Sequence, residues 1–498
     1  MSSVETLFAL ASEALKNQEP ERARDLCAEA RNQHPDDPRF VMLHGFALRR
    51  SGGNAEAEPL LRRTLKVDPS LEIAHHELGL ALKELGRLSE ARRADQTEPL
   101  GPLHGVPFTV KENIDLFGTP TTSGIPAGAE LMPSADAPVV KRMKNAGAIP
   151  VGRTNLPELG LRIDTDNPLR GRTLNPWDQT RTAGGSSGGE ASAIASGMSP
   201  LGLGNDIGGS VRNPAFCCGI SSLKPSAGRI PRASTIAPVE RGFADQWMAV
   251  DGPMARRVED LSVAYEVLSG REILDPMTVD VPLYGPDFPR RAAIVKEVPG
   301  VELPQSALEA IDKTQSVLQS AGWDVQEIQP PELERVHEIW AHVLSANFKP
   351  LVDDPELFPR LMSKELLAMW DYIFERYDPN KKSILELFSE RERLSVLWEK
   401  FFVDYPIVLG PVWTDIQFKN GADISSSAGY PITIDLLRFI SPANLLGLPS
   451  TALTVGESDG LPVGVQFYAA KWRDDISLSA ASIVEKELGI FCPINPRF

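Results

Sequence analysis

Short apolar runs alternate with helical segments from about residue 99 onward. The runs VPFTV (106–110), AIPVG (148–152) and MSPLGLG (198–204) predict short buried strands or strand ends, because glycine or proline punctuates them. Between them, residues 139–148 and 190–197 have helical patterns with glycine near the end, which helix C-termini favour. Strands that alternate with helices predict an α/β domain.

The second half of the chain has a different texture. Residues 300–405 are richer in helix formers and predict a mostly helical insertion or cover. Large aromatic residues recur in this segment: Trp340, Trp370, Tyr372, Phe388 and Trp398. The run VGVQFYA (463–469) and the helical pattern of residues 477–489 predict the last strand and helix of the sheet.

The first 95 residues carry an internal repeat. Two sets of small residues recur at an interval of 34 positions: Ala11, Gly45 and Gly79, and Ala23, Ala57 and Ala91. Pro35 and Pro69 keep the same interval, and helical apolar patterns surround them. The period and the small residues resemble those of tetratricopeptide repeats, roughly two and a half of them. This predicts an all-α repeat segment over residues 1–95, which either binds a protein or peptide or only caps the domain at 96–498.

Composition and charge exclude several classes of protein. The chain has 498 residues, of which 42% are hydrophobic and 24% charged, as is typical of globular proteins. Its formal net charge of −16 argues against nucleic acid as a partner, because phosphate binding needs a basic surface. The same charge disfavours anionic membranes. The sequence leaves open whether the chain forms a homodimer.

The cysteines and the N-terminus indicate a compartment. The four cysteines show no C-x-x-C spacing, so we expect neither a disulfide framework nor a metal site from them: Cys27, Cys217, Cys218 and Cys492. Residues 1–20 lack the basic and apolar regions of a signal peptide, and no run of roughly 18 apolar residues exists. We therefore expect a cytoplasmic protein without a membrane span.

The candidate chemistry lies in residues 184–212, GGSSGGEASAIASGMSPLGLGNDIGGSVR. Ser186 and Ser210 are both flanked by glycine, and neither flank supplies a histidine. A serine hydroxyl is a weak nucleophile until a base removes its proton. Lys111 is the candidate base, because the preceding run VPFTV would carry it into the interior, where burial favours a neutral amine. The alternatives are a surface lysine paired with Glu112, or a Ser–His–Asp triad that uses a distant histidine.

Only one of the seven histidines, His104, lies near a motif. The glycines before Ser210 have a mechanical use, since consecutive small residues allow several backbone N–H groups to converge on an oxyanion. The converging groups would belong to Ile207, Gly208, Gly209 and Ser210. A phosphate-binding loop is the rival interpretation, but the run lacks the G-x-x-x-x-G-K-[ST] pattern. A flexible linker is disfavoured by the apolar and helical residues between the glycine clusters.

These residues resemble the amidase signature family. The blocks that carry the resemblance include GPLHGVPFTVKENID (101–115), GRTLNPWDQTRTAGGSSGGEASA (171–193) and PLGLGNDIGGSVRNPAFCCGISSLKPSAGRIP (200–231). Further blocks are AGAIPVGRTNLPELG (146–160), DGPMARRVEDL (251–261), SPANLLGLPSTALTVG (441–456) and GLPVGVQF (460–467). The resemblance covers about residues 99–498 and is weak only at 270–430.

The resemblance implies a large mixed β-sheet covered by helices and a Ser–Ser–Lys triad. It implies that Ser210 is the nucleophile, Ser186 the proton bridge held by a cis Gly185–Ser186 peptide, and Lys111 the base. The oxyanion hole would come from residues 207–210. Gly160 would line the substrate side, and polar support would come from Ser187, Asp206 and Arg212. The implied activity is hydrolysis of the C–N bond of a small-molecule carboxamide, with no metal or organic cofactor.

Two departures from the family pattern stand out. The repeats occupy most of the space before PLHGVP where family members carry several helices, so the repeats either replace those helices or the domain lacks part of its cover. YPIVLGPVW (405–413) stands where the family more often shows an Asp-led strand ending in Thr-Pro, which puts the wall of the acyl pocket in question. Two other functions stay open: the amidase subunit of a glutamine-dependent amidotransferase, and a catalytically silent adaptor.

Overall fold

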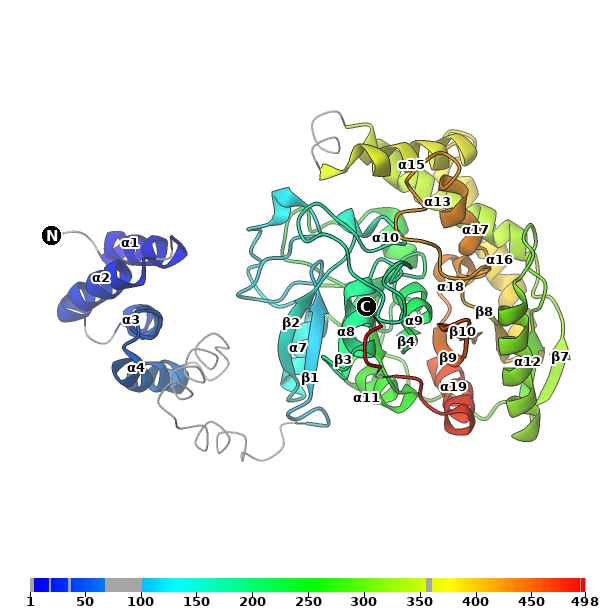
Figure 1. Cartoon of the computed structure of the whole chain (residues 1–498), viewed down its shortest axis with the longest axis horizontal. Coiled ribbons are helices and arrows are strands. Elements are labelled where there is room, and N and C mark those ends of the chain that lie inside the picture. The colour runs from blue at the N-terminus through cyan, green and yellow to red at the C-terminus, as the bar shows by residue number, and fades with distance from the viewer. Residues whose placement is uncertain are drawn as a thin grey trace. The chain divides into compact units, whose positions relative to one another are not determined.

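The chain folds into two compact units, Met1–Pro99 and Leu100–Phe498 (Figure 1). The computed structural model describes residues 4–17, 19–34, 37–67, 101–354, 361–492 and 494–497. Each unit has a hydrophobic core of its own.

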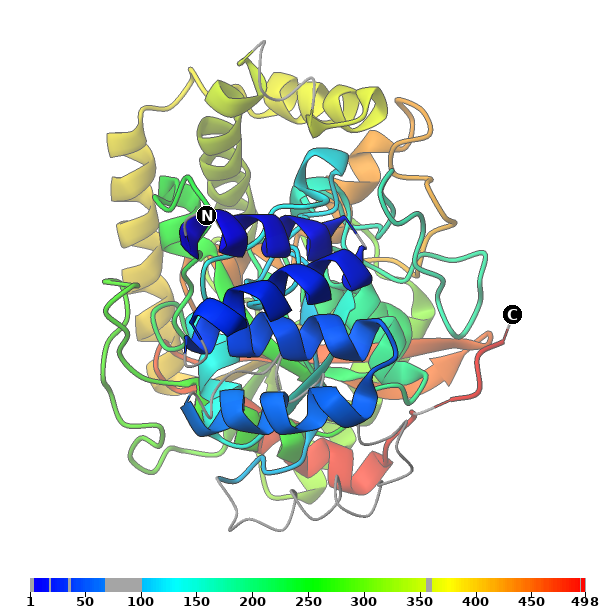
Figure 2. The ribbon, with the colours of Figure 1, turned by 90° about the vertical axis from the view of Figure 1, so that its left-hand side faces the viewer.

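Consecutive helices build the first unit, and each contacts the next: α1 (Val4–Lys16), α2 (Pro20–Gln33), α3 (Pro38–Arg50) and α4 (Asn54–Val67). In Figure 2 they lie side by side in chain order. Helix α3 begins and ends 34 residues after α1, and α4 keeps the same offset from α2. Asp37 caps α3 by accepting a hydrogen bond from the Arg39 backbone N–H at 3.0 Å.

Small residues permit the close approach of these helices. Ala11, Ala23 and Ala57 are completely buried. A Cβ atom placed on Gly45 would lie 3.0 Å from Leu61 Cδ2, so α3 and α4 could not pack as closely around a larger residue. The third expected unit, with Pro69, Gly79 and Ala91, lies outside the described residues.

The second unit is built on a mixed β-sheet. Within the described residues, ten strands pair in the order β2-β1-β3-β5-β4-β9-β10-β8-β6-β7. Their bounds are β1 (Pro107–Lys111), β2 (Ile149–Thr154), β3 (Leu201–Asp206), β4 (Ser221–Lys224), β5 (Val250–Ala255), β6 (Arg291–Ile294), β7 (Asp324–Glu327), β8 (Ile407–Pro411), β9 (Ser450–Ser458) and β10 (Leu461–Tyr468). Strands β2, β1 and β3 are parallel, the centre of the sheet is antiparallel, and β8, β6 and β7 are parallel again.

Helices cover this sheet in two groups. The helices α8 and α9 contact each other and pack on the central strands, while α7, α11, α19 and α12 contact one another in that order. The helical bounds are α7 (Pro138–Asn145), α8 (Gly188–Ala195), α9 (Arg212–Cys218), α10 (Phe243–Met248), α11 (Val258–Leu268), α12 (Gln305–Ser320), α13 (Leu333–Val352), α15 (Lys364–Arg376), α16 (Ile384–Asp404), α17 (Tyr430–Leu436), α18 (Ser441–Leu445) and α19 (Asp474–Leu488). Short 3₁₀ helices occur at η1 (Pro126–Gly128) and η2 (Glu158–Gly160).

The sequence prediction of a large mixed sheet covered by helices is confirmed. The three predicted early strands correspond to β1, β2 and β3, and the two predicted early helices to α7 and α8. The expected helical cover at 300–405 contains α12, α13, α15 and α16, and the edge strand β7 lies between α12 and α13 in the chain. The last strand and helix are β10 and α19, although β10 lies inside the sheet and not at its edge.

Candidate active site

Lys111 is the last residue of β1, and its side chain is completely buried. Because β1, β2 and β3 are parallel, their carboxyl ends meet at one edge of the sheet, where ligands of α/β proteins bind. The alternative of a surface lysine paired with Glu112 is therefore wrong. Glu112 instead pairs with Arg170, with 3.1 Å between Oε1 and Nη2.

The Lys111 amine has two close polar partners. Its Nζ donates hydrogen bonds to Ser186 Oγ and to Asn205 Oδ1, both at 2.7 Å. Asn205 is oriented in turn by Asn113, whose Oδ1 accepts from Asn205 Nδ2 at 2.8 Å. Sequence reasoning missed both asparagines, although Asn205 was visible as a polar residue at the carboxyl end of a buried strand.

Burial lowers the pKa of Lys111 to about 7. Three buried carboxyl groups act in the opposite direction and favour the charged amine: Asp206, Asp251 and Glu190. The side chain of Glu190 lies between two hydroxyl groups and accepts from Thr109 at 2.5 Å and from Thr154 at 2.7 Å. The amine is thus able to take up and release a proton near neutral pH.

The loop before α8 brings Ser186 to this amine. The Gly185–Ser186 peptide is cis, as the family resemblance implied. Gly160 has φ of +72°, and a Cβ atom placed there would lie 3.3 Å from Ser186 Oγ. The backbone N–H of Ser187 donates to the Ser210 carbonyl at 3.1 Å. This bond ties the loop before α8 to the loop before α9, so Ser186 and Ser210 stand on adjoining segments.

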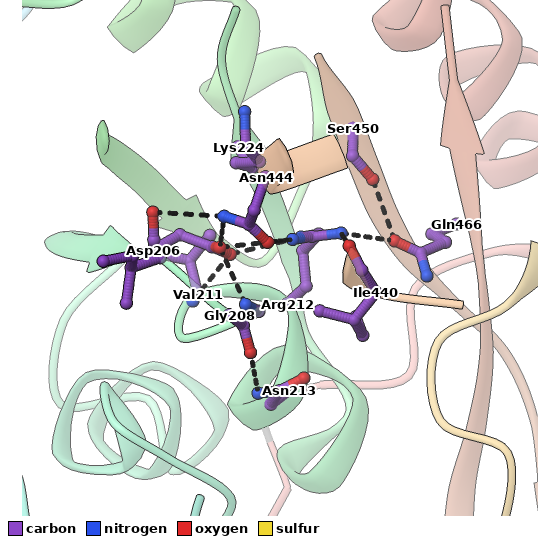
Figure 3. A network of polar contacts seen from close by, with 12 residues as sticks. Asp206, Gly208, Val211, Arg212, Asn213, Lys224, Ile440, Asn444, Ser450 and Gln466 are labelled. Atoms are coloured by element: carbon purple, nitrogen blue, oxygen red, sulfur yellow. Dashed lines mark hydrogen bonds and ion pairs between the residues drawn. The ribbon is translucent and has the colours of Figure 1, made fainter. Parts of the chain in front are cut away.

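The Ser210 loop is anchored by the Asp206 carboxylate (Figure 3). Asp206 Oδ1 accepts from the Gly209 backbone N–H at 2.8 Å, and Oδ2 accepts from the Val211 backbone N–H at 3.2 Å. Arg212 Nε lies 3.1 Å from Asp206 Oδ2. Burial alone would raise the pKa of Asp206, but the Arg212 guanidinium and further hydrogen bonds hold it at about 2.

Arg212 extends this anchor across the sheet. Its guanidinium donates to Asn444 Oδ1 at 2.7 Å and to Gln466 Oε1 at 2.9 Å. Gln466 also accepts from Ser450 Oγ at 3.0 Å (Figure 3). The sequence singled out Asp206 and Arg212 but not Asn444 or Gln466, which lie more than 200 residues farther along the chain.

One of the expected oxyanion donors already has a partner. The Gly209 N–H donates to Asp206, so it is directed at that carboxylate. Gly208 contributes its carbonyl oxygen to Asn213 Nδ2 at 3.0 Å. The expectation that the backbone N–H of Gly209 joins an oxyanion hole therefore does not fit this geometry, and Ile207, Gly208 and Ser210 remain as candidates.

Ser210 is one of the residues that line an apolar pocket with about 580 Å³ of empty space, part of it open to solvent. Gly160, Ile207 and Gly208 line it beside Ser210. Leu161, Arg162 and Ile163 follow Gly160 in this wall. The rest of the wall comes from segments farther along the chain: Trp340, Ala341, Leu344, Phe348, Met369, Trp370, Ile373, Thr433, Ile434 and Leu437. None of these residues belongs to 405–413, so that segment does not form this wall.

The single charged residue among these lining residues is already paired. Arg162 Nε and Nη2 each lie 2.7 Å from an oxygen of Asp423, and Nη2 lies 3.1 Å from Asp164 Oδ2. Both carboxylates are buried. Because the guanidinium is held by two carboxylates, the pocket suits an uncharged, apolar group.

Two histidines of the helical cover have other partners. His337 Nδ1 lies 3.2 Å from Ser441 Oγ, and His342 Nε2 lies 3.7 Å from Glu338 Oε1. Burial lowers the pKa of His337 to about 3, so its ring is neutral. Neither histidine is placed as the base of a Ser–His–Asp triad.

Comparison with known proteins agrees with this geometry. A protein-family model described as Amidase matches residues 57–478. The chain belongs to the amidase signature family. The family match begins within α4, ahead of the second compact unit.

Named relatives of this amidase-family chain include an amide hydrolase and an amidotransferase subunit. It is 36% identical over 450 residues to an indoleacetamide hydrolase of Bradyrhizobium diazoefficiens, covering 89% of this chain and 85% of the relative. It is 31% identical over 462 residues to a glutamyl-tRNA(Gln) amidotransferase subunit of Thermus thermophilus, covering 86% and 93%. Among solved structures, 6-aminohexanoate cyclic dimer hydrolase complexed with substrate is similar with a TM-score of 0.70 and 26% identity, covering 82% of this chain and 90% of that one.

Two kinds of feature are absent from the part of the chain that the structure describes. No helix there is long and apolar enough to cross a membrane. No group of three or more His, Cys, Asp or Glu side chains there could hold a metal ion.

Proposed function

We propose that this amidase-family chain hydrolyses a neutral carboxamide with an apolar, arylalkyl acyl group, releasing a carboxylate and ammonia or an amine. The proposal rests on one observation: a buried lysine with a lowered pKa contacts Ser186 at 2.7 Å, beside an apolar pocket that contains Ser210. A serine hydroxyl that is linked by hydrogen bonds to a neutral amine can lose its proton to that amine as it attacks a carbonyl carbon.

In the proposed reaction Ser210 Oγ attacks the amide carbon, and its proton passes through Ser186 to the neutral amine of Lys111. The backbone N–H groups of Ile207, Gly208 and Ser210 are the candidate donors to the oxyanion. The proton returns through Ser186 to the leaving nitrogen, the C–N bond breaks, and an acyl-enzyme on Ser210 remains. Water then attacks the ester carbon and gives a proton through Ser186 to Lys111. The bond between Ser210 Oγ and the acyl carbon breaks, the proton returns through Ser186 to Ser210 Oγ, and the carboxylic acid leaves and ionises to the carboxylate.

The acyl group is assigned from the pocket and from the relatives. The wall carries Trp340, Phe348 and Trp370, and its arginine is neutralised by two carboxylates. Such a wall favours a planar apolar group over a charged one. The similarity to an indoleacetamide hydrolase makes indoleacetamide the first substrate to test.

The experiment is a panel of carboxamides hydrolysed by the purified chain alone, with Ser210→Ala as the inactive reference. We expect release of ammonia from arylalkyl amides and a loss of at least about 10⁴-fold in the variant. Ser192→Ala is the matched control, because Ser192 Oγ donates to the Leu174 carbonyl at 2.9 Å and lies outside the pocket. Undiminished turnover by Ser210→Ala would overturn the proposal.

A second candidate function is the amidase subunit of an amidotransferase, which the similarity to glutamyl-tRNA(Gln) amidotransferase subunits favours. Such a subunit passes ammonia to a partner. Hydrolysis of simple amides by the isolated chain, without glutamine preference, would separate the two functions. An adaptor without catalysis would show neither turnover nor labelling of Ser210 by a fluorophosphonate.

We further propose that α1–α4 are two tetratricopeptide-like repeats. The support is the offset of 34 residues between the two helix pairs and the burial of small residues at equivalent points, Ala11 with Gly45 and Ala23 with Ala57. The same substrate panel, applied to the chain without residues 1–95, tests their role. Unchanged turnover indicates a separate binding unit, whereas loss of folding indicates that this segment completes the amidase domain.

A further inference from the structure

Trp340 contacts both the apolar pocket and the loop that carries Ser210. It is a buried residue of α13 that lines the apolar pocket, and its indole Nε1 donates to the Ile207 carbonyl at 3.2 Å. Its ring also lies against Gly208, because a Cβ atom placed on that glycine would come within 2.9 Å of Trp340 Cζ2. A residue of the distant helical cover thus contacts both ends of one peptide in the Ser210 loop.

The indole itself is held in place by its own helix. His337, one turn earlier on α13, stacks on Trp340 with 5.7 Å between the ring centroids and 25° between the planes. His337 Nδ1 lies 3.2 Å from Ser441 Oγ in α18. Because α13 packs on α18, the position of the indole follows the packing of these two helices.

The Trp340 hydrogen bond determines where one backbone N–H points. The Ile207–Gly208 peptide is not among the cis bonds of the chain, so its C=O and N–H point in opposite directions. With the Ile207 carbonyl held by the indole, the Gly208 N–H is directed away from Trp340. The next peptide is held in the same manner, by Asn213 at the Gly208 carbonyl and by Asp206 at the Gly209 N–H (Figure 3).

We infer that Trp340 is a positioning residue that aligns the Gly208 N–H for the oxyanion while forming part of the acyl-pocket wall. The inference rests on the proposed function, because it assigns that N–H to an oxyanion formed by attack of Ser210. Asp206 and Asn213 hold the loop from the motif side, and Trp340 holds it from the pocket side. An acyl group that packs on the Trp340 indole therefore influences the rate of acylation as well as the affinity for the substrate.

The test is Trp340→Phe, which keeps an aromatic ring and removes the N–H donor. The substrate is a small aliphatic amide such as propionamide, which makes little use of the pocket wall. We expect kcat to fall about tenfold and KM to stay within about twofold, because an oxyanion donor contributes in the transition state. The rate at which a fluorophosphonate labels Ser210 should fall by a similar factor, since that reaction also places charge on an oxygen.

Trp398→Phe is the matched control. Trp398 is completely buried in α16, and its indole Nε1 donates to the Pro331 carbonyl at 2.9 Å, so the variant loses the same kind of bond outside the pocket. We expect its kcat and labelling rate to stay within about twofold of the original protein. Equal losses in the two variants would mean that a buried indole bond matters only for stability, and would overturn the inference.

Gly208→Ala alone keeps the inference testable if Trp340→Phe does not fold. It would push a methyl group into the indole, so it should slow labelling of Ser210, and labelling at the original rate would overturn the inference. Where Trp340→Phe folds, its smaller ring leaves room for the methyl group, and the losses of the two substitutions should be less than additive. Additive losses would overturn the inference. If the original protein is not labelled at Ser210 at all, the proposed function fails, whereas equal labelling of all variants refutes the role of Trp340 alone.

Discussion

The floor of this active site and the wall of its pocket are built in different ways. The floor consists of Lys111 at a strand end and Ser186 and Ser210 on glycine-rich loops, within one stretch of about a hundred residues. Most of the wall comes from α13, α15 and α17, and consists mainly of apolar side chains with no motif. In the proposed mechanism the floor carries the polar chemistry and the wall selects the acyl group. Apart from Trp340, substitutions in the two regions should therefore change different kinetic constants.

The largest expected effect comes from comparing Lys111 of the floor with Lys224, a second buried lysine whose amine donates to backbone carbonyls instead of a serine. Burial lowers the pKa of Lys111 and also that of Lys224 to about 7. Lys111 contacts Ser186, whereas Lys224 Nζ donates to the carbonyls of Pro225 and Leu448 at 2.8 and 2.7 Å. We expect Lys111→Met to reduce kcat about 10³-fold, because the proposed general base is lost.

The matched control is Lys224→Met. It should lower the free energy of unfolding, because two buried carbonyls lose their donor. Each unsatisfied carbonyl costs roughly 1–3 kcal/mol. Its kcat per folded molecule should stay within about twofold. Rate measurements and denaturant titrations on both variants separate these effects. A comparable fall in kcat for both would mean that buried positive charge, and not contact with the serine, supports turnover.

The sequence predicted the floor better than the wall for a physical reason. Lys111, Ser186 and Ser210 are held by local features, namely a short apolar strand and glycine turns, which leave a pattern in the chain. Trp340 and Trp370 reach the pocket only through the packing of α13 and α15 on the domain. Aromatic residues at helical spacing look alike in a core and in a pocket wall, so their role could not be predicted.

Among the strands and the buried polar residues, too, some could be predicted from local sequence and others could not. Strand β7, with the sequence DVQE, is mostly exposed and has no apolar run, so its pairing with β6 left no signal. Asn444 and Gln466 support Arg212 from segments that are adjacent only in the folded chain. Asn205 is different, because it lies directly beside Asp206 at the end of β3 and was accessible to sequence reasoning.

The charge around the Lys111 amine should set the pH dependence of the floor. Asn205→Asp would place a carboxylate where Oδ1 now lies 2.7 Å from Nζ, and would raise the pKa of Lys111 above its value of about 7. In the proposed mechanism the neutral amine is the base, so kcat/KM should rise with pH through that pKa. We expect the acid limb to move to higher pH by one unit or more, which is at least about a fivefold loss at pH 7 and a recovery at higher pH.

Asn113→Asp is the comparison for this shift. The new carboxylate would lie beyond Asn205, one hydrogen bond farther from Lys111 Nζ. The acid limb of kcat/KM should therefore move less than in Asn205→Asp. The pH dependence of kcat/KM for both variants gives the two shifts directly. A loss that is constant across pH would show that Asn205 only orients the amine and does not set its pKa.

The smallest expected effect concerns the wall alone. Trp370 lines the pocket from α15, and its indole donates to the Leu161 carbonyl at 3.2 Å, outside the Ser210 loop. Trp370→Leu should raise KM for an arylalkyl amide about tenfold, because aromatic contact area is lost, and should leave kcat nearly unchanged. For propionamide neither constant should move by more than about twofold. Trp323→Leu, a buried tryptophan that packs on Phe288 away from the pocket, is the control for stability. If Trp370→Leu lowers kcat for both substrates as Trp340→Phe is expected to do, then the wall acts on the chemistry as a whole, and the division between floor and wall does not hold.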